Sequence, residues 1–246
     1  MIISHTYKFI FIKTKKTAGT SIETYLSPLC EESDVFTSVG REKATEQHKE
    51  RNYKGFFNPF AGTHDYDTLF ENFIQLGAQY IAPYKIARHH AKFYNHMPAE
   101  LVRARIPKHI WNTYYKFCIE RDYLDKTISH FYHMKKRYNR YFDKDITFEE
   151  YIHEGTFCLN YPQYTDYNGN VMVDYIAKYE NLSDELSMIF DKLHIPFEGT
   201  LGVRAKGKTR KDKRPASAFF SGENEKFIPV LKKAFKKEIQ ILEEQK

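Results

Sequence analysis

The chain has 246 residues, of which 41% are hydrophobic and 28% charged, and 38 Lys and Arg against 32 Asp and Glu give a net charge of +6. At this length roughly 70–75% of the unfolded surface can be buried, which excludes a disordered chain and a small disulfide scaffold. No apolar run approaches the ~20 residues that span a bilayer, and charged residues interrupt segment 1–13 too often for a signal peptide. We therefore expect a single cytoplasmic domain, 1–246, without an integral membrane segment.

Three cysteines, Cys30, Cys118 and Cys158, lie far apart and lack the spacing of metal ligands. We interpret them as small buried or half-buried residues and expect no disulfide and no metal site.

The first clear element is a β-branched and aromatic run, 7–12, which predicts a buried strand. A small polar segment, 13–21, follows it and leads into a helical stretch, 22–26, that Pro28 ends. A loop between the carboxyl end of a parallel strand and the amino end of a helix binds ligands, because backbone amides and the positive helix end face outward there. The three lysines and the hydroxyls of segment 13–21 predict an anion, most simply a phosphate. An exposed polar turn with solvated lysines is the alternative.

Strands and helices alternate over the rest of the chain: a helix over 98–106 with Pro98 in its first turn, a buried strand over 114–119, a helix from 123 to 138, a strand over 170–179, a helix capped by Ser183, and a last helix over 223–244. Segment 31–80 has no clear pattern. This order favours an α/β fold, a three-layer α/β/α arrangement with a mainly parallel central sheet.

The second strand ends in a polar turn that contains Arg121, and Ser129 follows on the next helix. An arginine at a strand end and a serine on the following helix can converge on one dianionic phosphate, the arginine through a charge-assisted fork. Alternatively, Arg121 pairs with Asp122 or Asp125 at the surface, and Ser129 is an ordinary helix residue.

Segment 11–21, Phe-Ile-Lys-Thr-Lys-Lys-Thr-Ala-Gly-Thr-Ser, resembles the 5'-phosphosulfate loop of sulfotransferases that use 3'-phosphoadenosine 5'-phosphosulfate. It is most similar to the carbohydrate branch, whose loop usually reads Pro-Lys-Thr-Ala-Gly-Thr-Ser; Lys15 stands in place of the proline. It is not a Walker A loop, because its lysine precedes its only glycine. The resemblance implies a P-loop NTPase-like fold and donor binding by Lys15, Lys16, Thr17, Ala18, Gly19, Thr20 and Ser21.

Segment 117–130 similarly resembles the family's 3'-phosphate segment, with Arg121 and Ser129 as the binding pair and Tyr123 in place of the usual proline. Segments 111–117 and 179–182 also agree with the family. Where the family often has a basic loop over the nucleotide, this chain has 206–210, which implies that Lys206, Gly207 and Arg210 bind the donor. The resemblance extends from Phe9 to the last helix and leaves out 31–80.

Seven basic residues lie between Arg204 and Arg214, against one acid, Asp212. One interpretation is a lid that folds onto the nucleotide phosphates or an anionic acceptor. The other is a solvated loop.

The resemblance implies that Lys16 neutralises the leaving phosphate and that a histidine accepts the acceptor's proton, with no metal needed. His96 ranks first, because it begins a His-x-x-Ala-x-x-x-Arg segment similar to the family's; His90 is second and His64 third. A capping or packing role for His96 is the alternative.

The expected activity is transfer of a sulfuryl group from 3'-phosphoadenosine 5'-phosphosulfate to a hydroxyl or amino group, with 3'-phosphoadenosine 5'-phosphate as product. The expected acceptor is a carbohydrate, held by loops within 31–80 and 140–170, where aromatic residues either stack on sugars or pack in the core. A P-loop kinase of a small molecule or nucleotide is the enzymatic alternative. A nucleic-acid-binding protein is the alternative of another class, but 32 acidic residues and the lack of a recognised motif disfavour it. The sequence does not determine the oligomeric state.

Overall fold

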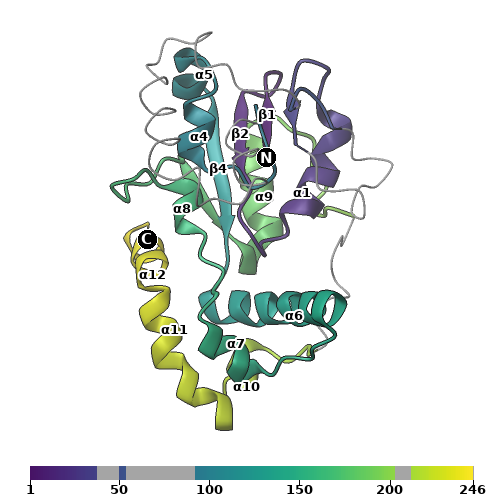
Figure 1. Ribbon diagram of the computed structural model, residues 1–246. Coiled ribbons are helices and arrows are strands. Elements are labelled where there is room, and N and C mark those ends of the chain that lie inside the picture. The colour runs from purple at the N-terminus through teal and green to yellow at the C-terminus, as the bar shows by residue number, and fades with distance from the viewer. Residues whose placement is uncertain (38–49, 54–91, 203–211, 246) are drawn as a thin grey trace, which may run out of the picture.

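The computed structural model describes residues 1–37, 50–53, 92–202 and 212–245. This part of the chain forms an α/β fold with one five-stranded sheet and ten α-helices (Figure 1). The strand order is β3-β1-β2-β4-β5. The strands are β1 (Ile2–Ser4), β2 (Phe9–Ile12), β3 (Val35–Phe36), β4 (Tyr115–Glu120) and β5 (Tyr175–Lys178).

The sheet is mixed, so the prediction of a mainly parallel sheet is only partly right. Strands β2, β4 and β5 run parallel, whereas β1 is antiparallel to both β2 and β3. The short connection over residues 5–8 makes β1 and β2 a hairpin, which requires antiparallel pairing. We did not predict β1 or β3, since runs of two or three apolar residues carry no periodic signal.

The α-helices are α1 (Gly19–Leu26), α4 (Ala99–Arg103), α5 (Lys108–Thr113), α6 (Tyr123–Phe142), α7 (Phe148–Glu154), α8 (Tyr161–Tyr164), α9 (Leu182–Lys192), α10 (Ala216–Phe219), α11 (Ile228–Ala234) and α12 (Lys236–Glu244). Short 3-10 turns cover Ser27–Leu29, Tyr179–Asn181 and Gly222–Phe227. None of the helices in the described ranges is long and apolar enough to cross a bilayer.

Three predicted helix boundaries are wrong for local reasons. Helix α4 ends at Arg103 rather than at 106, because a proline at 107 disfavours helical backbone in the residue before it. Ser183 does not cap α9; the 3-10 turn ending at Asn181 runs directly into that helix. The last helix starts at Ile228, not at 223, since Pro229 is tolerated only in a first turn. It is also interrupted at Phe235, between α11 and α12.

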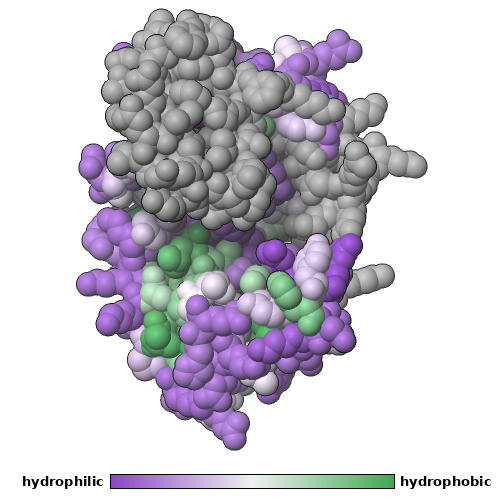
Figure 2. Space-filling model, in the orientation of Figure 1, coloured by the Kyte–Doolittle hydropathy of each residue, from purple (hydrophilic) through white to green (hydrophobic). Residues whose placement is uncertain are grey.

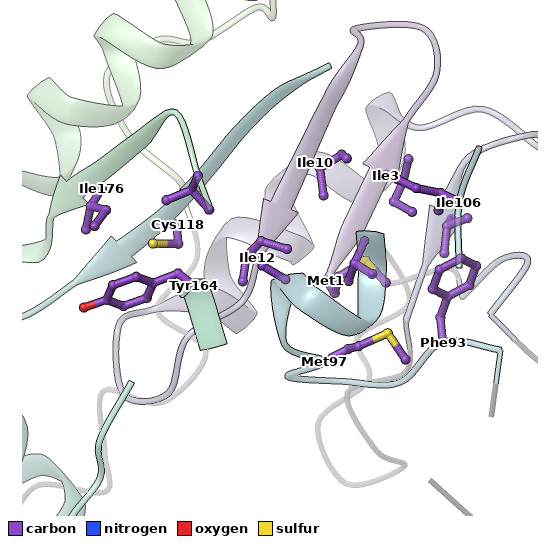
Figure 3. Close-up of a cluster of buried hydrophobic side chains, with 14 of the residues drawn as sticks. Met1, Ile3, Ile10, Ile12, Phe93, Met97, Ile106, Cys118, Tyr164 and Ile176 are labelled. Atoms are coloured by element: carbon purple, nitrogen blue, oxygen red, sulfur yellow. The ribbon is translucent and has the colours of Figure 1, made fainter. Parts of the chain in front are cut away.

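The side chains of the sheet alternate between two apolar clusters, one on each face, as the pleat of a strand requires. One face packs with α4, α8 and α12, and Figure 3 shows part of this cluster, in which Ile10, Ile12 and Cys118 meet Met97 and Tyr164. The other face packs Phe9, Phe11 and Phe117 against α1 and α9, with Ile22, Leu26, Leu186, Ile189 and Phe190. Leu186, Ile189 and Phe190 thus form the buried face of α9.

A third apolar cluster lies between α6, α7, α10 and α11, below the sheet in Figure 1. It is rich in aromatic rings: Phe148 contacts Phe131, Tyr151, Phe219, Phe220 and Phe227 at centroid distances of 5.0 to 6.0 Å. Edge-to-face contacts of this kind stabilise a core beyond the area they bury. Much of the aromatic content of the chain is used here.

The prediction of buried cysteines is confirmed: Cys30, Cys118 and Cys158 are all buried and free. Burial raises the pKa of Cys30 to about 12 and that of Cys158 to about 11, so these thiols stay protonated at neutral pH.

A buried ion cluster joins the end of β2 to α1. The Glu23 carboxylate accepts from the Lys13 ammonium and from the Met1 amino group, and all three groups are at most 2% exposed. Burial by itself raises the pKa of Glu23, but its interactions with the Met1 amino group and the Lys13 ammonium outweigh burial and hold that pKa below its ordinary value. Glu23 is therefore ionised at neutral pH and acts as the counter-charge of Lys13.

Replacing Glu23 by Gln leaves the Lys13 ammonium buried without a counter-charge. Removing one partner of a buried ion pair costs about 3–5 kcal/mol, so we expect the free energy of unfolding, measured in urea, to fall by about that amount. The control is Glu149→Gln, whose carboxylate pairs with Lys226 at the surface; it should change stability little. Equal losses in both variants would contradict the structural role of Glu23.

Candidate functional site

The parallel strands β2, β4 and β5 end at one edge of the sheet, and a pocket of about 1050 Å³ lies there. Lys13 follows β2, Arg121 follows β4 and Tyr179 follows β5, and all three line the pocket. The pocket is also lined by His96, by Lys213 and by Ser129 of α6. Other lining residues belong to the loop with the start of α1, or to the 3-10 turn with the start of α9: Thr14, Lys16, Thr17, Ala18, Gly19, Thr20 and Ser21, and Glu180, Asn181, Leu182, Ser183 and Asp184. The carboxyl edge of a parallel sheet is where such folds bind ligands.

The phosphate-loop candidate, residues 13–21, has an unusual backbone. Lys16 and Ala18 adopt left-handed conformations, with φ of 65° and 60°, and α1 begins at the next residue, Gly19. Alternating left- and right-handed residues turn successive amides toward one concave side, where they attract anions. The first amides of α1 have no partner within the helix and carry its positive dipole end. This backbone is suited to an anion, as the sequence predicted.

Thr20 gives an independent sign of a ligand in this loop. Thr20 lines the pocket, the residue is 4% exposed, and its buried Oγ1 has no hydrogen-bond partner among the described residues. Buried hydroxyls are rarely left unsatisfied. A phosphate oxygen that reached this hydroxyl would accept a hydrogen bond from it, so the residues present suit a phosphate.

Gly19 is needed for packing rather than for its φ. A Cβ at this position would lie 2.7 Å from Cγ of Lys13 and 3.0 Å from its Cε. The aliphatic stem of Lys13 thus passes directly against the start of α1 on its way to Glu23. The ion pair of Lys13 with Glu23 therefore requires glycine at position 19, because a larger residue there would displace the Lys13 stem.

The three lysines of the loop have different positions. The Lys13 ammonium is buried on Glu23, whereas Lys16 is half-buried and lines the pocket. Lys15 is exposed and is not among the lining residues; its backbone N–H and C=O instead bond to the side chain of Asn160 at 2.9 and 3.0 Å. The prediction that Lys15 binds the donor stays a prediction, and its side chain is not part of the pocket lining.

Arg121 and Ser129 are brought together as predicted, since both line the pocket. The Arg121 guanidinium donates to Asp125 at 2.7 Å and to the backbone carbonyl of Lys16 at 3.1 Å, and it stacks over the Tyr179 ring at 4.1 Å. Arg121 thus pairs with Asp125 and lines the pocket at the same time. Asp122, the other suggested partner, caps α6 by accepting from two backbone amides.

His96 also lines the pocket, next to the end of β2. Its Nδ1 lies 3.0 Å from the carbonyl oxygen of Lys13, and its backbone is left-handed, with φ of 61°. A carbonyl oxygen only accepts, so Nδ1 carries the hydrogen, and the neutral ring has its lone pair on Nε2. This tautomer is the one a general base at Nε2 requires.

Another histidine, His130, lies on α6 close to Lys16. Burial and the charge of Lys16 lower the pKa of His130 to about 3, and its Nδ1 lies 2.9 Å from the Tyr151 hydroxyl. This imidazole is neutral and belongs to the packing of α6 on α7. It illustrates why a histidine cannot be assigned a role from sequence alone.

Several expected site residues lie outside the described residues: His64, His90, Lys206, Gly207 and Arg210. Lys213, at the end of the basic 204–214 segment, is described and lines the pocket. The described residues contain no group of His, Cys, Asp and Glu side chains that could hold a metal ion.

Sequence reasoning missed the wall of the pocket formed by the start of α9 and the segment after it. Tyr179 and residues 180–184 line one part, and Phe197, Thr200 and Leu201 line another. The position of Tyr179 directly after a parallel strand is the signal that would have found this wall.

An uncharacterized protein from Archaeoglobus fulgidus is 35% identical to this chain over 108 residues, which are 42% of this chain and 86% of the archaeal protein. The chain belongs to the same family as this archaeal protein. No family model and no solved structure matches the chain. Membership of this family therefore assigns no activity.

The tight contact at Gly19 yields a test of the loop's packing. In Gly19→Ala the new methyl group meets the Lys13 stem, and overpacking of this kind costs about 1–3 kcal/mol. We expect the free energy of unfolding to fall by that amount in urea titration. The neighbouring variant Ala18→Gly places glycine at a left-handed position, which it adopts readily, and should change stability by less than about 1 kcal/mol. A Gly19→Ala protein as stable as the parent would show that the Lys13 stem does not pack there.

Proposed function

We propose that this protein is a sulfotransferase that uses 3'-phosphoadenosine 5'-phosphosulfate as donor, in a three-layer α/β/α domain of the P-loop-like kind. The observation that supports the proposal is that two elements suited to bind anions line one pocket. The loop 16–21 forms one, and Arg121 with Ser129 forms the other. They are joined directly, because the Arg121 guanidinium donates to the carbonyl oxygen of Lys16 at 3.1 Å.

A pocket with two such elements suits a ligand with two separate phosphate groups better than one with a single chain of phosphates. The loop would hold the 5'-phosphate end through backbone amides and Thr20. Arg121 and Ser129 would hold the 3'-phosphate through charge-assisted hydrogen bonds. Tyr179 and Phe197, which also line the pocket, offer ring faces for the base.

The donor supplies an activated sulfuryl group, which is transferred to an acceptor hydroxyl or amino group. Lys16 would neutralise the negative charge that develops on the phosphate side of the breaking bond. Nε2 of His96 would take the proton of the acceptor, since Nδ1–H is held by the Lys13 carbonyl. The S–O bond to the phosphate breaks as the bond to the acceptor forms, and the phosphate leaves on the nucleotide.

The alternative of a P-loop kinase has less support in the described residues. Such an enzyme needs a carboxylate at a strand end to hold magnesium, but Glu120, at the end of β4, is 1% exposed and bonded to Lys126. Asp122 is used as the cap of α6. No observation in the structure favours nucleic-acid binding.

The proposal is tested by ligand-induced stabilisation. A ligand that binds the native state raises the melting temperature, so we expect 3'-phosphoadenosine 5'-phosphate to do so in the absence of magnesium. Stabilisation by ATP with magnesium alone would refute the proposal and favour the kinase. Transfer of labelled sulfate onto sugars, lipids and phenols would then identify the acceptor, which we propose to be a carbohydrate.

Two adjacent lysines provide a matched pair of variants. Lys16 lines the pocket and Lys15 is exposed outside it. We expect Lys16→Ala to lower the rate of transfer by about 10²–10³, the usual effect of losing one group that stabilises the transition state. Lys15→Ala should leave the rate close to that of the parent. Equal effects in both variants would contradict the assignment of Lys16.

The role of His96 is tested by separating binding from transfer. His96→Gln should bind 3'-phosphoadenosine 5'-phosphate like the parent protein, as measured by calorimetry, and should lose about 10²–10⁴ in turnover. Full activity in His96→Gln would exclude His96 as the base.

A further inference from the structure

We infer that Asn160 is a positioning residue that fixes the phosphate loop to a buried ion cluster shared by both anion-binding elements. This inference rests on the proposed function. Neither Asn160 nor the cluster lines the pocket, so their effect on a ligand would be exerted through the backbone.

The Asn160 side chain forms a two-point contact with the loop. Its Oδ1 accepts from the backbone N–H of Lys15 at 2.9 Å, and its Nδ2 donates to the carbonyl of the same residue at 3.0 Å. Strand β2 ends at Ile12, before Lys15. The side-chain amide of Asn160 therefore makes to Lys15 the pair of hydrogen bonds that a neighbouring strand makes to a sheet residue. Asn160 is fully buried. Its amide supplies both the acceptor and the donor that Lys15 requires.

Asn160 is itself fixed by a cluster of three buried ionisable side chains. Its Nδ2 also donates to Glu120 at 3.1 Å, and its backbone N–H donates to Glu238 of α12. The Lys126 ammonium lies between these carboxylates, at 2.7 Å from Glu120 and 2.5 Å from Glu238. All three side chains of the cluster are at most 2% exposed. A buried network with this many satisfied groups is rigid.

The same cluster holds the second anion-binding element. The Glu120 carboxylate accepts from the backbone N–H of Arg121 at 2.9 Å. Lys126 lies on α6 one turn before Ser129, so its ion pairs fix the helix that presents this serine. The loop and the Arg121–Ser129 pair are thus both fixed to one rigid ion cluster, which sets the distance between them.

The loop needs such a support, because its backbone is strained. Lys16 and Ala18 are left-handed although neither is glycine, and such residues persist only where the surrounding structure holds them. Asn160 holds the backbone of Lys15, directly before Lys16, through two hydrogen bonds. Without these bonds the loop would populate other conformations, and the apparent affinity for a ligand would fall by the fraction of time spent in them.

The variant Asn160→Asp turns this geometry into a pH-dependent test. A protonated aspartic acid retains an acceptor and one donor, whereas the ionised form lacks the donor and repels the Lys15 carbonyl. Glu120 and Glu238 face the new carboxyl from β4 and α12, with Lys126 of α6 as the only cation paired to them among the described residues. Burial beside two carboxylates favours the protonated form of a third.

The experiment compares calorimetric affinities for 3'-phosphoadenosine 5'-phosphate in the full chain at several values between about pH 5 and pH 8. Relative to the parent, Asn160→Ala should bind about tenfold to a hundredfold more weakly at every pH. A protonated carboxyl has one donor for the two acceptors that Asn160 Nδ2 serves, so Asn160→Asp should bind more tightly than Asn160→Ala at the acid end without reaching the parent, and should weaken where the carboxyl ionises. The control is Tyr164→Phe, which removes a hydroxyl that donates to Glu120 at 3.2 Å but does not contact Lys15; its affinity should not change.

Melting temperatures establish that each variant is folded, and amide hydrogen exchange of residues 15–21 is measured without ligand. Exchange there should be faster in Asn160→Ala than in Tyr164→Phe. Parent-like affinity and exchange in a folded Asn160→Ala would overturn the inference. If the parent itself does not bind the nucleotide, the proposed function fails, and the exchange comparison still decides whether Asn160 holds the loop.

Discussion

The fold of this protein depends on the pairing of buried charges at the carboxyl edge of its sheet. An ammonium group removed from water needs a counter-charge within hydrogen-bond reach. Lys13 meets Glu23, and Lys126 meets Glu120 and Glu238. These pairs connect β2 to α1 and β4 to α6 and α12, so the elements around the pocket are held by ions rather than by apolar contacts alone.

The same constraint separates structural charges from those available to a ligand. Lys13 and Lys16 are three residues apart, and both line the pocket. The ammonium of Lys13 is bound by Glu23, which leaves the loop amides, Thr20, Lys16 and Arg121 as the groups that would meet an anion. Figure 2 shows one face of the molecule, on which an apolar area lies next to hydrophilic residues. The buried ammonium of Lys13 therefore serves the fold, whereas the half-buried Lys16 would meet a ligand.

The local elements that position the site were predictable from sequence, and the long-range ones were not. The strand before Lys13, the strand before Arg121 and the helix of Ser129 follow from apolar runs bounded by polar turns. The pairing of β1 with β3 and the aromatic cluster around Phe148 depend on partners far along the chain. Glu238 bonds to Asn160 across 78 positions of sequence, a contact that no periodicity encodes.

Three neighbouring lysines show where sequence reasoning stops. Their side chains are identical and all three lie in the predicted loop. Yet the Lys13 ammonium is buried on Glu23, Lys16 is half-buried in the pocket wall and Lys15 is exposed. The difference arises from two backbone facts: β2 ends at Ile12, and the chain turns left-handed at Lys16. Between these points Lys15 contributes its peptide groups, which bond to Asn160. The position of each lysine is thus set by the path of the main chain, and that path is held by residues more than a hundred positions away along the chain.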